Sequence, residues 1–173
     1  NKILHGYQYL RIVGFFQEDN AKAKDLRYQQ ENSLLAIGSG GLTGKGLDNN
    51  DITSVKNGNL ISESHTDFIF TIVGEELGFI GGAAVIILLL LIVLECFITG
   101  SRAPTYSGRL FCYGFGVLIG TQTLVNIAVA TMLLPNTGVT LPFVSYGLTS
   151  LLSLYFGIGV VLNIGLQRTK AML

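Results

Sequence analysis

The pattern of polar and apolar residues changes abruptly near Asp67. Before it lies most of the charge of the chain, and after it come three uncharged runs, Leu77 to Leu94, Leu110 to Leu134 and Phe143 to Gln167. The first run has 18 residues, which as a helix rising ~1.5 Å per residue extend roughly 27 Å, close to the hydrocarbon thickness of a bilayer. The pattern predicts an all-α polytopic membrane protein with three transmembrane helices in residues 68–173.

Residues 1–67 are predicted to form a large extracytoplasmic loop with interfacial helices. Residues 1–16 mix apolar and basic groups and indicate an interfacial helix or the end of a truncated span, whereas 17–27 are polar and favour a solvated helix or loop. Tyr28 to Gly46 predicts a turn or two of amphipathic helix and ends in five glycines within nine residues. Taken alone, this glycine-rich segment favours a flexible surface loop; the alternative is a backbone that approaches an anion near Lys45.

Basic residues flank the predicted spans on one side. Arg102 and Arg109 lie in the connection between the first two spans, and Arg168 and Lys170 follow the third, while the turn from Pro135 to Pro142 carries no charge. Cytoplasmic loops of membrane proteins are enriched in Lys and Arg. We therefore expect that connection and the tail in the cytoplasm, and the long segment before the spans outside.

Polar groups within the apolar part are candidates for function. Asp67, Glu75 and Glu76 gather at the outer end of the first span. A carboxylate near lipid is costly and faces a protein interior or a wet cavity, so Asp67 is a functional candidate; the alternative is an interfacial acid at a helix start. Gln122 and Asn126 are four residues apart on one helix face, and we expect both to face other helices.

Composition narrows the class further. The chain of 173 residues is 49% hydrophobic and only 13% charged, with a net charge of zero, which excludes a soluble domain and argues against nucleic acid as a partner. Cys96 and Cys112 fall inside predicted spans, where packing is expected rather than a disulfide. The chain begins with Asn1 and shows no signal peptide, so we expect it to be part of a longer protein.

Several short motifs match a known family when taken in order along the chain. The sequence resembles the SEDS family (shape, elongation, division and sporulation proteins), bacterial membrane enzymes that polymerise the lipid-linked peptidoglycan precursor. That family has about ten spans, so the resemblance implies the C-terminal part of a ten-helix bundle. The motifs are Tyr7-Gln8 with Arg11-Ile12, Ala36-Ile37-Gly38-Ser39-Gly40-Gly41-Leu42 with Gly44-Lys45-Gly46, His65-Thr66-Asp67-Phe68-Ile69-Phe70 with Gly74-Glu75-Glu76-Leu77-Gly78, and Leu134-Pro135 with Leu141-Pro142-Phe143-Val144-Ser145-Tyr146-Gly147.

The resemblance implies a catalytic role for Asp67, the acid of the His-Thr-Asp motif. It also implies lipid II as the membrane substrate, a class B penicillin-binding protein (a transpeptidase) as partner, and an active site on the outer face of the bacterial inner membrane. No cofactor is certain, although a divalent cation is implied by the family; no cluster in the sequence has metal-ligand spacing. The expected substrate-binding residues are Lys45, Arg11, His65, Thr66, Ser145 and Tyr146, with Glu75 and Glu76 in support.

Three functions are compatible with these features. A glycosyltransferase is favoured, because the acids gather at one rim while only neutral amides lie deep. A flippase for the same lipid would use Gln122, Asn126 and Glu95 as a polar path, and a scaffold would bind the transpeptidase without catalysis. The sequence does not decide between the elongation, division and sporulation branches of the family, although Gly44-Lys45-Gly46 favours the rod-shape branch.

Overall fold

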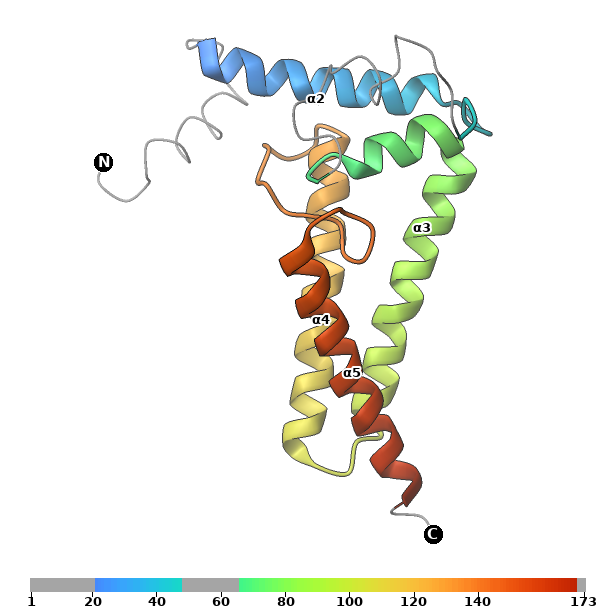
Figure 1. Cartoon of the computed structure of the whole chain (residues 1–173), viewed down its shortest axis with the longest axis vertical. Helices are drawn as coiled ribbons and strands as arrows, with labels where there is room; N and C mark the ends of the chain where they lie inside the picture. Colours follow the sequence, from blue (N-terminus) through green and yellow to red (C-terminus); the bar gives the residue numbers. More distant parts are fainter. Residues whose placement is uncertain (1–20, 48–65, 171–173) are drawn as a thin grey trace, which may run out of the picture.

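The computed structural model describes residues 21–47 and 66–170 of the chain (Figure 1). Within these ranges it contains the helices α2 (Ala21–Ser39), α3 (Ile69–Ser101), α4 (Tyr106–Ala130) and α5 (Leu148–Lys170), and no strand. The all-α fold class is therefore confirmed. The expectations for residues 1–16, Arg11 and His65 lie outside the described residues.

The helices α3, α4 and α5 are each long and apolar enough to cross a membrane, which confirms the three predicted spans. However, few residues in the most apolar stretches of these helices are buried by the rest of the chain: 17% in α3, 28% in α4 and 22% in α5. Leucines and isoleucines on their outer faces are exposed. Most of the surface of this bundle is thus left for lipid or for further helices.

A break at Gly78 divides α3 into two parts. Gly78 has φ 65° and ψ −165°, outside the helical region, a conformation that is open to glycine and strained for other residues. The short part, residues 69–77, runs across the end of the bundle beneath α2, and the long part, residues 79–101, runs along the bundle (Figure 1). The predicted first span is corrected accordingly: Leu77 belongs to the crossing part, and the helix along the bundle continues past Leu94 to Ser101.

The other two spans also differ from prediction at their ends. The hydroxyl oxygen of Thr105 accepts a hydrogen bond from the Gly108 N–H at 3.2 Å and caps the start of α4. α5 begins at Leu148 rather than at Phe143, because Phe143 adopts φ 61° in a turn before the helix. The uncharged run in the sequence does not mark this boundary, since the turn is itself apolar.

α2 lies across one end of the bundle, here called the α2 end (Figure 1). Its buried polar side chains bind carbonyl groups in the last turn of α4, which lack partners within their own helix, and one carbonyl group in the segment that follows α4. The Gln30 amide donates to Val129 O at 3.1 Å and to Leu134 O at 2.8 Å, and the Ser33 hydroxyl donates to Ala130 O at 2.8 Å. Gln30 and Ser33 of α2 are therefore directed inward, and α2 closes the end of the bundle.

The two cysteines lie in a separate hydrophobic cluster towards the other end of the bundle. Cys96 and Cys112 are fully buried, unpaired and packed with Val161 and Ile164. Gly116 lies against Cys96: a Cβ atom added at Gly116 would lie 3.1 Å from Cys96 Cβ. The predicted packing role of the cysteines is confirmed.

Candidate active site

The glycine-rich segment is docked on the break in α3. We call residues 40–46 the glycine clasp. It binds the carbonyl groups that end the short part of α3 and the N–H groups that begin the long part, which the break leaves without helical partners. The interpretation of this segment as a flexible surface loop is therefore wrong. The four backbone hydrogen bonds are Lys45 N to Glu75 O (3.0 Å), Gly46 N to Glu76 O (3.0 Å), Phe79 N to Gly41 O (2.9 Å) and Ile80 N to Leu42 O (3.1 Å).

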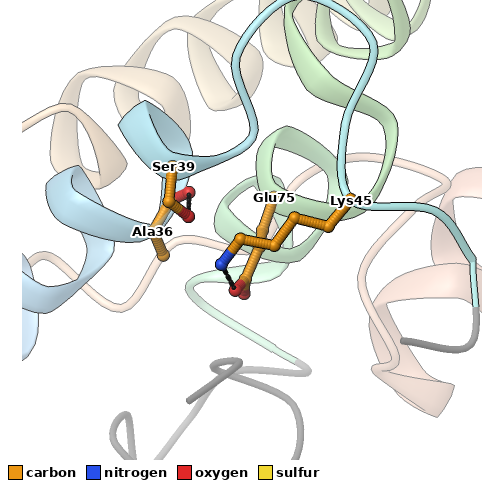
Figure 2. Close-up of polar contacts among 4 residues, drawn as sticks. All are labelled: Ala36, Ser39, Lys45 and Glu75. Atoms are coloured by element: carbon orange, nitrogen blue, oxygen red, sulfur yellow. Dashed lines mark hydrogen bonds and ion pairs between the residues drawn. The ribbon is translucent and has the colours of Figure 1, made fainter. Parts of the chain in front are cut away.

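An ion pair reinforces the clasp (Figure 2). Lys45 Nζ lies 2.8 Å from Glu75 Oε1, and the Glu75 side chain is almost completely buried while that of Lys45 is partly exposed. Glu75, expected as a supporting residue, thus pairs with Lys45. Nearby, the Ser39 hydroxyl donates to Ala36 O at 2.7 Å and closes the last turn of α2 (Figure 2).

Removal of the Lys45 charge is expected to destabilise the protein. Lys45→Met leaves the buried Glu75 carboxylate without this cation, and we expect the free energy of unfolding to fall by roughly 2 kcal/mol, less than for a fully buried pair because Lys45 is partly exposed. The double variant Lys45→Met/Glu75→Gln removes both charges and should recover part of the loss. Thermal unfolding in detergent measures both effects.

A second ion pair supplies the control. Arg27 Nε and Glu31 Oε1 lie 2.9 Å apart on α2 with both side chains substantially exposed, so Arg27→Met should change the free energy of unfolding by only about 0.5 kcal/mol or less. Equal losses in Lys45→Met and Arg27→Met would contradict an anchoring role for Lys45.

Asp67 lies at the far end of the crossing part of α3. It is half-buried, in the turn just before Ile69. Because the crossing part runs over the end of the bundle (Figure 1), it carries Asp67 away from the long part of α3 and next to α4 and the turn before α5. The structure therefore places Asp67 over the end of the bundle instead of at the top of a span.

Two buried side chains hold the backbone around Asp67. The Asn126 amide on α4 donates to Asp67 O at 2.8 Å and to Val139 O at 2.7 Å, and the Ser145 hydroxyl donates to Thr66 O at 2.7 Å. Asn126 is 1% exposed and Ser145 is 3% exposed. Asn126 was expected to face other helices; its amide instead binds carbonyl groups in the turns before α3 and before α5. Together, the contacts of Asn126 and Ser145 join the Asp67 segment to α4 and to the turn before α5.

The segment between α4 and α5 is ordered by its own hydrogen bonds. Asn136 Oδ1 accepts from the Gly138 N–H at 3.1 Å, and Ser145 Oγ accepts from the Leu141 N–H at 2.8 Å. Thr140 Oγ1 lies 3.3 Å from Ser150 Oγ in the first turn of α5. Ser145 lies beside the Asp67 segment through its hydrogen bond to Thr66 O. The side chain of the following residue, Tyr146, is 82% exposed.

An apolar groove of about 520 Å³ lies beside the crossing part of α3. Phe70, which is three residues after Asp67, lines it. Ile37, Phe79 and Ile127 line it from α2, from the long part of α3 and from α4. The α2 end thus combines a half-buried carboxylate with an apolar groove.

The structure places the expected site residues in two groups. Thr66, Asp67 and Ser145 come together at the end of the crossing helix. Lys45 and Glu75 form the ion pair at the clasp, with Glu76 beside it through its carbonyl oxygen. Sequence reasoning gave Asn126 a role only in the alternative flippase path and did not link it to Asp67; the signal that marked it was an amide in an otherwise apolar helix.

No metal centre is formed by the described part of the chain. Within residues 21–47 and 66–170, no group of three or more His, Cys, Asp or Glu side chains is arranged to hold a metal ion.

Comparisons with known proteins identify relatives of the chain. Residues 2–170 match the family of FtsW, RodA and SpoVE, described as "Cell cycle protein". A "Probable peptidoglycan glycosyltransferase FtsW" of Enterococcus hirae is 42% identical over 168 residues, which are 96% of this chain and 40% of that protein. A protein of the same name from Pseudoalteromonas translucida is 35% identical over 174 residues, 98% of this chain and 42% of that protein. Both carry the FtsW name, so neither supports the rod-shape branch.

A solved structure also resembles this fold. It is described as "Structural coordination of polymerization and crosslinking by a peptidoglycan synthase complex", and one of its chains matches with a TM-score of 0.67 and 28% identity. The match covers 95% of this chain and 43% of that one. The chain thus spans about two fifths of the length of these relatives.

Proposed function

The chain belongs to the SEDS family, the family of FtsW, RodA and SpoVE, and we propose that the full-length protein is a peptidoglycan glycosyltransferase. Its substrate is lipid II, a disaccharide-peptide on undecaprenyl pyrophosphate. The observation that carries this proposal is the position of Asp67, half-buried at the end of the crossing helix and held there through its backbone by α4 and the turn before α5.

The proposed reaction needs one base and one leaving group. The Asp67 carboxylate takes the proton from the C4 hydroxyl of the acceptor sugar as that oxygen attacks the anomeric carbon of the donor. The new C–O bond forms on the opposite side from the pyrophosphate, whose C–O bond breaks and whose oxygen keeps the electron pair. A single displacement inverts the α-linked donor into a β-linked product, so a nucleophilic side chain is unnecessary.

The other expected site residues divide between substrate binding and support of the fold. Tyr146 is exposed beside the Asp67 segment and is proposed to contact the sugar. Arg11, His65 and Thr66 stay proposals for substrate binding. Lys45 is engaged with Glu75, which supports anchoring of the clasp as its main role. No step is assigned to a divalent cation.

The amphiphilic character of the site supports a lipid-linked substrate. The half-buried carboxylate can act on a polar sugar, while the groove that begins at Phe70 offers apolar surface of the kind that a polyprenyl chain covers. A flippase instead requires polar groups that serve the lipid head group through the depth of the membrane. The Asn126 amide is already committed to two backbone carbonyl groups, which favours the enzyme over the flippase.

The finer aspects of location and assembly follow the same proposal. The protein is placed in the bacterial inner membrane with the α2 end outside, where the peptidoglycan is made. A class B penicillin-binding protein, which cross-links the strands, is the proposed partner, in line with the peptidoglycan synthase complex described for the structural relative. The non-catalytic scaffold remains the alternative that a polymerisation assay tests: glycan-chain synthesis from purified lipid II by the full-length protein and its Asp67→Asn variant.

Cysteine labelling tests the proposed topology. In a full-length variant without other cysteines, Thr137→Cys should react with a membrane-impermeant maleimide from outside, and Ser107→Cys only after the membrane is opened. Both positions are exposed, in the turn before α5 and in the first turn of α4 respectively, so access to the reagent decides the result. Labelling of Ser107→Cys alone in intact cells would reverse the assigned orientation.

A further inference from the structure

The turn that carries Asp67 is not fixed by a helix cap of its own. Phe68 stands at the N-cap of α3 with φ −109° and ψ 25°, and no side chain there accepts from the first turn of the helix. N-cap side chains such as Ser, Thr, Asp or Asn ordinarily hold the start of a helix. Contacts from α4 and from the turn before α5 hold the backbone of this turn instead.

Asn126 and Ser145 supply these contacts on both sides of the Asp67 Cα atom. Ser145 Oγ binds the carbonyl oxygen of Thr66, in the peptide plane before Asp67, and Asn126 Nδ2 binds the carbonyl oxygen of Asp67, in the peptide plane after it. Peptide planes are rigid, so the orientation of these two planes determines φ and ψ of Asp67. Those two angles in turn determine the direction of its Cα–Cβ bond.

The two anchors are themselves held in place. The second donor hydrogen of the Asn126 amide binds Val139 O at 2.7 Å, and Ser145 Oγ accepts from the Leu141 N–H at 2.8 Å. Both side chains are almost completely buried, so water does not compete for these bonds. Because the amide of Asn126 faces two carbonyl oxygens, only its NH₂ group fits there, and an acceptor in its place would be repelled.

We infer that Asn126 and Ser145 are positioning residues that together aim the Asp67 carboxylate at the acceptor hydroxyl. This inference rests on the proposed function. It assigns to Ser145 a backbone contact in place of the expected contact with substrate, and it assigns to Asn126 a part in the reaction without contact to the reacting atoms. A general base must lie within hydrogen-bonding reach of the proton that it removes, so a small rotation of the base lowers the rate without weakening substrate binding.

The test is steady-state polymerisation of purified lipid II by the full-length protein in detergent. We expect Ser145→Ala and Asn126→Leu each to lower kcat about 10- to 100-fold, the cost of a small misplacement, with KM nearly unchanged. Asn126→Asp keeps the side-chain volume but replaces the donor group by an acceptor, so its kcat should fall at least as much as that of Asn126→Leu. The double variant should lose less than the product of the single losses, because the two residues act as a unit.

Two matched controls separate positioning from packing. Ser153→Ala removes a hydroxyl that donates within α5, to Ser150 O. Gln122→Leu changes an amide one turn from Asn126 on the same face of α4. Both should keep the wild-type kcat. Thermal unfolding is measured for every variant. If an Asn126 variant does not fold, Ser145→Ala, which removes a single oxygen, still tests the positioning role.

The outcomes distinguish this inference from the function on which it rests. If Asp67→Asn abolishes synthesis while Ser145→Ala and Asn126→Leu keep the wild-type kcat, the positioning role is wrong and the function stands. A rise in KM at constant kcat would instead return Ser145 to substrate binding and overturn the inference. If Asp67→Asn itself polymerises at the wild-type rate, it is the proposed function that fails.

Discussion

Asp67→Asn is expected to slow glycan-chain synthesis by the full-length protein about 10²- to 10⁴-fold, the usual consequence of removing a general base. The amide has nearly the same shape as the carboxylate and retains its hydrogen-bonding capacity, but it cannot take the proton of the acceptor hydroxyl. The contacts that hold this turn go to the carbonyl oxygens of Thr66 and Asp67, which the substitution leaves in place. Folding and binding of lipid II should therefore be largely retained, as measured by thermal unfolding and by co-purification of labelled lipid.

Glu76→Gln provides the control for this substitution. Glu76 is a half-buried acid in the same crossing helix, and its contact with the clasp runs through its backbone carbonyl group. We expect this variant to keep most of the wild-type rate. A wild-type rate in Asp67→Asn contradicts the catalytic assignment, whereas a variant that makes no glycan yet moves labelled lipid across vesicles would support the flippase.

The sequence predicted the number of spans and the position of the acid because both depend on local composition. Uncharged runs of sufficient length mark the membrane helices, and Asp67 stands at the change from polar to apolar sequence. The ends of the spans were less certain, because the turn before α5 is as apolar as the helix that follows it. Phe143 is an example: its backbone has φ 61° in the turn, and a phenylalanine gives no indication of a positive φ.

The contacts that build the site could not be predicted from the sequence. Asn126 binds the carbonyl oxygens of residues 59 and 13 positions away, and a carbonyl group is present at every residue, so no residue type identifies the partner. The break at Gly78 was hidden for a similar reason. The segments from Gly40 to Gly46 and from Gly74 to Gly82 together contain eight glycines in 16 residues. Only some of these positions require glycine, and the sequence does not say which.

The glycine clasp is where a single added methyl group is expected to do the most structural damage. Gly44 has φ 79°, and a Cβ atom there would collide with the backbone at Glu76 O and Leu77 C. These neighbours are main-chain atoms of the crossing helix, which cannot move aside as a flexible side chain can. Gly44→Ala must therefore push the clasp off the break in α3, and the hydrogen bonds from Lys45 N and Gly46 N to that helix are lost with it.

Gly46→Ala separates this collision from backbone strain. Gly46 also has a positive φ, 95°, but nothing lies within 4 Å of a Cβ atom built there, so that variant bears only the strain of the backbone conformation, about 1 to 2 kcal/mol. We expect Gly44→Ala to lower the melting temperature in detergent clearly more than Gly46→Ala, and to lower polymerisation as well, because the crossing helix that carries Asp67 loses its support at the break. Equal melting temperatures for the two variants would mean that the clasp yields at Gly44 without cost, and the crossing helix would then have to be held by its contacts with α2 and α4 alone.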